Sequence, residues 1–220
     1  MRMGGFLDSH PDLRFRLLAM GRYKEGRYED ALVYFKRSGR YADKLSQGMV
    51  AEMLWQGQGV PRDRALAYAW MDLAAERGYR RLLLLRERYW AELNEAERAR
   101  ALEEGRGIYA EYGDDVAQRR IATVLRRASK RMTGSRLGAS AGTRNLQVWI
   151  PGPGAVAGTG AGDTNLYIVS GASFYEPKFW EPEQYQAWHD TMWKWSEEQV
   201  GRVEVGELEN ADAPSEGDIE

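Results

Sequence analysis

Two stretches of the chain, Tyr23–Phe35 (YKEGRYEDALVYF) and Leu54–Trp70 (LWQGQGVPRDRALAYAW), repeat one pattern with small changes. In each stretch a glycine follows an apolar helical run, and an alanine then opens the next run. Glycine permits the chain to turn at positive φ, and alanine allows two helices to approach closely. The repeated pattern therefore predicts two copies of a helical hairpin.

The copies differ in the length of the bend between glycine and alanine. Gly26 and Gly57 are 31 residues apart, whereas Ala31 and Ala65 are 34 apart, so the second bend is longer by three residues. A near-constant period of this size is typical of stacked helical hairpins. The pattern predicts an all-α fold, an α-α solenoid, and it favours protein binding over catalysis.

Helical periodicity runs from residue 11 to residue 132 and predicts seven helices. Pro11 is suited to a first helical turn, and Asn94 with Glu97 matches a capping box. We expect the first helix at about 11–26 and a second helix that ends near residue 39. The other five are expected at about 43–56, 63–78, 81–91, 94–113 and 114–132. In the fourth helix the inward stripe is expected to be Ala65, Leu66, Ala69, Trp70, Leu73 and Ala74.

After residue 132 the pattern changes. Residues 133–144 are rich in glycine and serine and are predicted to be a linker. Alternating residues near 146–150 and 166–169 predict two short strands around a glycine-rich loop at 151–164. Within the same segment, 145–200, Tyr185 and Trp188 belong to a helical aromatic stripe that predicts a capping helix from near Pro182. Residues 201–220 are predicted to be a disordered acidic tail.

The second copy, with Gly57-Gln-Gly-Val-Pro-Arg-Asp63 and Ala74-Ala75-Glu-Arg-Gly78, resembles the Sel-1-like repeat of bacterial proteins. The first copy resembles the related tetratricopeptide repeat, which has a tighter bend, and the chain departs from the Sel-1-like pattern where Leu54 replaces a tyrosine. The structural repeat positions are Gly26, Ala31, Gly57, Gly59, Asp63, Ala65, Ala74 and Gly78. The resemblance covers residues 11–132 and implies a scaffold or adaptor that binds another protein.

Composition limits the other classes of function. The 31 basic and 33 acidic residues give no net field that would attract nucleic acid, and the absence of cysteine excludes disulfides and thiolate metal sites. No apolar run approaches the roughly 18 to 20 residues of a membrane helix. The start of the chain does not match a secretory signal, so it indicates a cytoplasmic protein, or a periplasmic one if a signal segment is missing.

The sequence holds no pattern of catalytic residues. His10 and His189 lack the spacing of a zinc site, and the loop at 151–164 lacks the lysine of a phosphate-binding loop. We therefore expect no catalytic residue, no metal, no cofactor and no enzyme activity.

Candidate partner-binding residues are aromatic or basic. The aromatic candidates are Tyr23, Trp55 and Trp193, of which Trp193 is expected to project away from the packed face of its helix. The seventh helix carries a basic stripe, defined by Arg119, Arg120, Arg126, Arg127, Lys130 and Arg131. The stripe is expected to attract an acidic protein partner or the acidic tail, or else to be only a solvated face. No aromatic residues interleave with it, which argues against nucleic acid.

A second function remains open from the sequence. Exposed aromatic rings can stack on sugars, so Trp149, Trp180 and Trp193 suggest an envelope protein that binds glycan or peptidoglycan.

Overall fold

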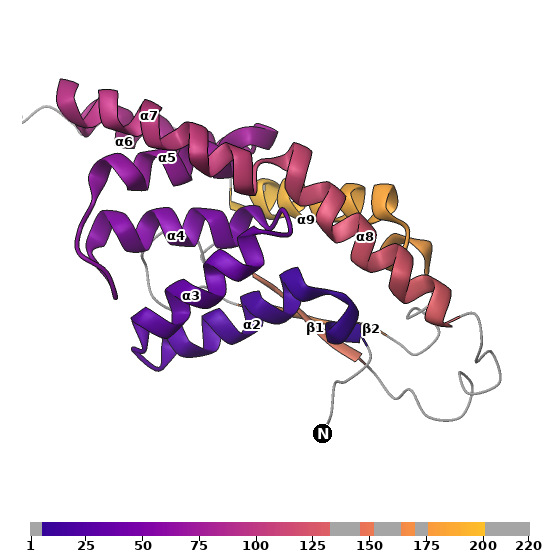
Figure 1. Ribbon diagram of the computed structural model, residues 1–220. Helices are drawn as coiled ribbons and strands as arrows, with labels where there is room; N and C mark the ends of the chain where they lie inside the picture. The colour runs from indigo at the N-terminus through magenta and orange to yellow at the C-terminus, as the bar shows by residue number, and fades with distance from the viewer. Residues whose placement is uncertain (1–5, 133–145, 152–163, 170–175, 201–220) are drawn as a thin grey trace, which may run out of the picture.

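The computed structural model describes residues 6–132, 146–151, 164–169 and 176–200. The first of these ranges is helical, and Figure 1 shows its helices packed next to one another. They are α1 (Phe6–Ser9), α2 (Pro11–Lys24), α3 (Tyr28–Gly39), α4 (Lys44–Gln56), α5 (Arg64–Ala74), the 3-10 turn η1 (Ala75–Arg77), α6 (Arg80–Glu92), α7 (Glu95–Tyr112) and α8 (Asp114–Met132). The predicted linker, the glycine-rich loop between residues 152 and 163 and the acidic tail lie outside the described residues.

The later elements are two strands and a final helix. Strand β1 (Leu146–Pro151) runs antiparallel to β2 (Thr164–Val169), with Leu146 opposite Val169. The 3-10 turn η3 (Pro177–Phe179) leads into α9 (Pro182–Val200), which lies beside α8 in Figure 1. The division of the chain into domains at residues 132 and 145 stays a prediction.

The first four long helices form two stacked hairpins. Helix α2 packs on α3, α3 packs on α4, and α4 packs on α5. This arrangement confirms the predicted helical solenoid. The third pair departs from it, because α6 and α7 each pack mainly against α5. Helix α5 is therefore the centre of the solenoid, with neighbours on both sides.

Glycines set the bends, as the repeat pattern predicts. Gly57 ends α4 in the left-handed conformation, with φ of 73°, a conformation in which side chains with a Cβ are strained. Gly59 has φ of 69°, and a Cβ there would lie 2.5 Å from backbone atoms of Tyr28 and Glu29. The longer second bend thus touches the start of α3, so it joins the two hairpins. Gly26 and Gly78 also have positive φ.

The expected inward stripe of α5 is too narrow. Leu66 is only partly buried, whereas Ala67 and Met71, which the stripe omits, are fully buried in the main core. Ala65 packs instead with Leu93 and Ala101 on the α7 side. The physical reason is that α5 is covered from two directions, so the apolar face is wider than a single-sided amphipathic helix requires.

A buried charge network joins the hairpins to α8. The Nζ of Lys44 is fully buried, 2.7 Å from Glu76 and 3.0 Å from Asp114. Arg77 donates two hydrogen bonds to Asp114, at 2.6 and 3.1 Å. Burial alone would raise the pKa of the Asp114 carboxyl, but its hydrogen bonds and charge pairing with Arg77 and Lys44 lower the pKa overall. Asp114 therefore remains ionised and holds α8 to the solenoid.

Candidate binding site

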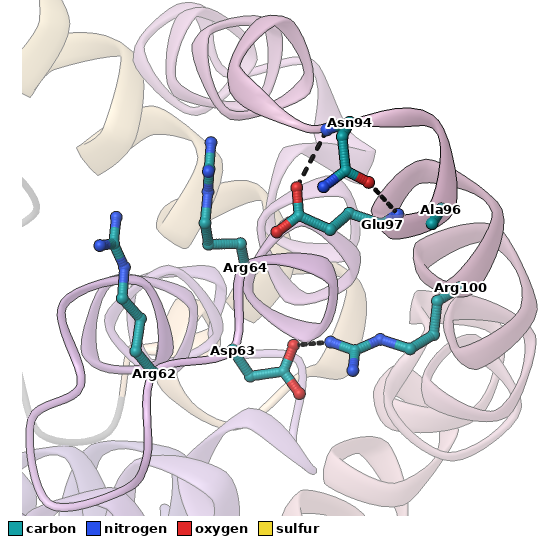
Figure 2. Close-up of a pocket in the computed structure, with 7 residues that line it drawn as sticks. All are labelled: Arg62, Asp63, Arg64, Asn94, Ala96, Glu97 and Arg100. Atoms are coloured by element: carbon teal, nitrogen blue, oxygen red, sulfur yellow. Dashed lines mark hydrogen bonds and ion pairs between the residues drawn. The ribbon is translucent and has the colours of Figure 1, made fainter.

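A pocket of about 430 Å³ opens between the N-terminal ends of α5 and α7. Two loops supply its walls, the one before α5 and the one before α7 (Figure 2). Its lining residues are Arg62, Asp63, Arg64, Asn94, Ala96, Glu97 and Arg100. Three of the seven side chains are guanidinium groups, so we call it the arginine pocket.

Helix caps fix the two loops of the arginine pocket. Asp63 accepts a hydrogen bond from the backbone N–H of Leu66 at 3.0 Å and so caps α5. Asn94 and Glu97 form the predicted capping box at the start of α7, with both hydrogen bonds at 2.9 Å. The carboxylates of the pocket are thus partly occupied by helix N-termini. Both are structural groups, and Asp63 also positions Arg100.

The three arginines differ in how far their charge is neutralised. Arg100 reaches from α7 to pair with Asp63 (Figure 2) and also lies 3.5 Å from Glu104. Arg64 donates to the backbone oxygen of Glu92 and lies 3.9 Å from the Glu92 carboxylate, while its buried Nε has no hydrogen-bond partner in the described part of the chain.

Arg62 is the least neutralised of the three. Among the described residues it has neither a hydrogen bond nor an ion pair, and its guanidinium lies 6.0 Å from the ring centre of Trp55. Figure 2 shows it extending away from the pair that Arg100 forms with Asp63. Its charge is available to a ligand.

Trp55 forms an aromatic wall next to the arginine pocket. Its ring stacks on Tyr89 with centroids 4.0 Å apart, and the guanidinium of Arg64 lies over it at 4.9 Å. Stacking on an aromatic face orients a guanidinium while leaving its N–H groups available for hydrogen bonds. Trp55 is therefore a supporting residue of this site.

The structure does not bring the other sequence-derived candidates to the arginine pocket. Tyr23 donates to the side-chain oxygen of Gln58 at 2.9 Å and packs against Tyr28, so it joins α2 to the long bend. The basic stripe lies on α8, where its described members Arg119, Arg126, Arg127 and Lys130 are exposed. Arg120 also donates to backbone oxygens, among them that of Glu111 at 3.1 Å. The roles of these residues in partner binding stay predictions.

Two tryptophans are placed differently from the sequence expectation. Trp193 was expected to project away from the packed face, yet its ring stacks on Tyr79 with centroids 4.8 Å apart. Trp180 is buried against Phe6 and His10. Trp193 is partly buried because α9 contacts the solenoid on a wider face than one aromatic stripe, whereas Trp180 is buried because η3 packs against Phe6. The third candidate for sugar stacking, the Trp149 ring, lies outside the described side chains.

Sequence reasoning missed a buried polar cluster that includes Asp12. The hydroxyl of Tyr185 donates to this carboxylate at 2.6 Å, and His189 Nε2 lies 3.5 Å from the same oxygen. Burial raises the pKa of Asp12 to about 6, and it lowers the pKa of His189 well below the ordinary value. The sequence around Asp12 indicates only a helix start at Pro11. Nothing local in the sequence indicates a partner 173 residues away.

Comparisons with known proteins are sparse. No protein-family model matches the chain, and no curated protein matches it. A solved structure of a protective antigen from uropathogenic Escherichia coli, described as displaying an SLR fold, is similar with a TM-score of 0.37 and 18% identity. The match covers 54% of this chain but only 23% of the antigen. The solenoid description therefore rests on the chain's own helix packing.

Within the described residues, no helix is long and apolar enough to cross a membrane. The same residues contain no group of three or more histidine and carboxylate side chains placed to hold a metal ion.

Proposed function

We propose that this chain is a non-catalytic interaction scaffold that binds an acidic segment of a protein partner at the arginine pocket. The observation that carries the proposal is the open charge of Arg62 beside Arg64, next to the Trp55 ring. A guanidinium binds carboxylate through two parallel hydrogen bonds, which an acidic side chain or chain end supplies. The helical solenoid provides the rigid frame that such a site requires.

The charges of the pocket support an anionic ligand. Its lining holds three arginines against two carboxylates, Asp63 and Glu97, and both carboxylates already accept backbone hydrogen bonds. An incoming acid therefore meets guanidinium groups that are not fully paired. The adjacent Trp55 ring offers apolar contact to a neighbouring residue of the same segment. A short acidic peptide with an aromatic or aliphatic residue has this chemistry.

The test is a binding titration with a fluorescently labelled glutamate-rich peptide that contains one aromatic residue. Replacing both Arg62 and Arg64 by glutamine is expected to weaken binding roughly fivefold to tenfold, since each exposed pair contributes up to about 1 kcal/mol. Arg106→Gln is the matched control, because this exposed arginine of α7 is outside the pocket lining. Arg126→Gln tests the basic stripe in the same way.

Binding by the wild-type chain, the pocket double variant, Arg106→Gln and Arg126→Gln distinguishes the arginine pocket from the basic stripe. Loss of binding in the pocket variant, with both single controls near wild type, supports the proposal. Equal binding by the pocket variant and the wild-type chain overturns it. Weakening by Arg126→Gln alone would assign the acidic partner to the basic stripe and would also reject the arginine pocket.

A further inference from the structure

The C-terminal segment from η3 to α9 covers one continuous surface of the solenoid. Helix α9 lies along α8 in Figure 1, and Tyr185 is only 1% exposed among Ile121, Leu125 and Trp188. The hydroxyl of Tyr185 reaches past α8 and donates to Asp12 of α2 at 2.6 Å. This side chain therefore anchors α9 to two helices at once.

A second anchor lies further along α9. Asp190 accepts a hydrogen bond from Arg77 at 3.3 Å and another from the Tyr79 hydroxyl. Trp193 then stacks on the Tyr79 ring at an interplanar angle of 11°. Because Tyr185, Asp190 and Trp193 lie within about two and a half turns, one helix supplies all three groups from a single broad face.

The turn η3 adds an aromatic anchor at the other end. Phe179 and Trp180 pack edge-on against Phe6, with ring centroids 5.5 and 5.8 Å apart. His10 of the neighbouring turn makes a 2.7 Å hydrogen bond to the backbone oxygen of Phe179. The segment thus wraps the solenoid from α1 to η1. We call the surface beneath it the α9 groove, defined by Phe6, Asp12, Arg77, Tyr79, Ile121 and Leu125.

The α9 groove combines apolar packing with polar contacts that are incompletely satisfied. Asp12 Oδ1 and His189 Nε2 are both buried without a hydrogen-bond partner in the described part of the chain. The side chain of Asp190 remains 41% exposed, so water can compete for its hydrogen bonds. Buried polar groups are normally paired, and unpaired ones weaken the contact that buries them. These unpaired groups oppose the apolar packing that holds α9.

We propose that the α9 groove is a helix-docking surface, that α9 is its releasable ligand in cis, and that its partner is an amphipathic helix with equivalent anchors. Such a helix carries a tyrosine, a carboxylate five residues later and a second aromatic ring three residues beyond. Amphipathic helices that insert regularly spaced anchors into a groove are a common recognition mode. The surface is distinct from the arginine pocket, which lies at the starts of α5 and α7, so this inference goes beyond the proposed function.

The test adds a labelled peptide of residues 176–200 to the full-length chain. In the wild-type chain α9 competes for the groove, so the peptide is expected to bind weakly. A chain carrying Tyr185→Phe and Asp190→Asn loses both polar anchors of its own α9 but keeps every groove residue. It is expected to bind the wild-type peptide at least tenfold more tightly. The same peptide carrying both substitutions is expected to bind at least tenfold more weakly.

Control variants distinguish release of α9 from a general loss of folding. Glu183→Gln and Thr191→Ala change exposed positions of α9 and are expected to leave peptide binding at the wild-type level. Tryptic cleavage after Lys194 reports release directly and is expected to be faster in the double variant. If that variant does not fold by circular dichroism, Asp190→Asn alone serves, because it alters a partly exposed side chain.

Two results overturn the proposal. One is faster cleavage after Lys194 without tighter peptide binding, because an open groove would then show no affinity for the helix. The other is unchanged cleavage and unchanged binding in the variant, because the anchors would then not hold α9.

Discussion

Helices α5 and α9 both complete the solenoid, but they combine apolar and polar contacts differently. Helix α5 buries Ala65, Ala67 and Met71 between neighbours on two sides, and these side chains have no polar group. Helix α9 combines the apolar contacts of Tyr185 with hydrogen bonds to Asp12 and Arg77. On the proposed account, the apolar burial makes α5 part of the permanent framework, whereas the incompletely paired polar groups let α9 exchange.

The largest expected effect concerns the buried cation that links α4 to both η1 and α8. Replacing Lys44 by methionine leaves Glu76 and the Leu73 carbonyl without this donor, while Asp114 keeps Arg77. Breaking a buried ion pair costs roughly 3 to 5 kcal/mol. Urea denaturation measures the loss. Lys24→Met changes an exposed lysine of α2 and is the matched control. A free energy of unfolding equal to that of the control would mean that the framework does not depend on this charge.

The next effect depends on pH and concerns the anchor of α9. Burial raises the pKa of Asp12 from 3.8 to about 6, so the folded protein binds this proton more tightly than the unfolded chain. The resulting stability is complete below pH 3.8 and is lost as the pH rises through 6. Asp12→Asn removes this dependence of stability on pH while keeping a hydrogen-bond acceptor for the Tyr185 hydroxyl.

The variant is expected to gain roughly 3 kcal/mol relative to wild type between these limits, since one pKa unit corresponds to about 1.4 kcal/mol. Urea denaturation at pH values from 3.5 to 7 measures this difference. In both proteins the side chain at position 12 faces the same groups, Tyr185, His189, Arg16 and Asp43. Their contributions to the free energy of unfolding therefore cancel to first order. A difference that stays constant with pH would contradict the account of the cluster.

The smallest of the three effects tests the apolar side of the comparison. Ala65 is fully buried against Leu93 and Ala101, so Ala65→Leu is expected to overpack the contact and cost about 1 to 3 kcal/mol. Thermal denaturation measures it, with Ala110→Leu at an exposed position of α7 as control. An unchanged melting temperature would show that α5 is not enclosed between α4 and α7.

The sequence predicts the local features of α5 and the capping helix α9 with its Tyr185 and Trp188 stripe, but not the polar partners of α9. The glycine bend after α4 and the cap at Asp63 depend on residues close in the chain, and the structure contains both. The pairing of Tyr79 with Asp190 joins residues 111 positions apart, and no periodicity encodes such a pair. For the same reason the sequence predicts an exposed Trp193, although this ring stacks on Tyr79, the residue before α6. The arginine pocket likewise arises only when the loops before α5 and α7 meet.

Hydrogen–deuterium exchange of the full-length chain tests the contrast between framework and exchangeable helix most directly. Amides in stable cores exchange only through global unfolding, whereas weakly held elements open at lower free energy. We expect the amides of α4 and α5 to exchange at the global rate and those of α9 to exchange at least tenfold faster. Equal protection of α9 and α5 across the same denaturant series would contradict the claim that α9 is a releasable element.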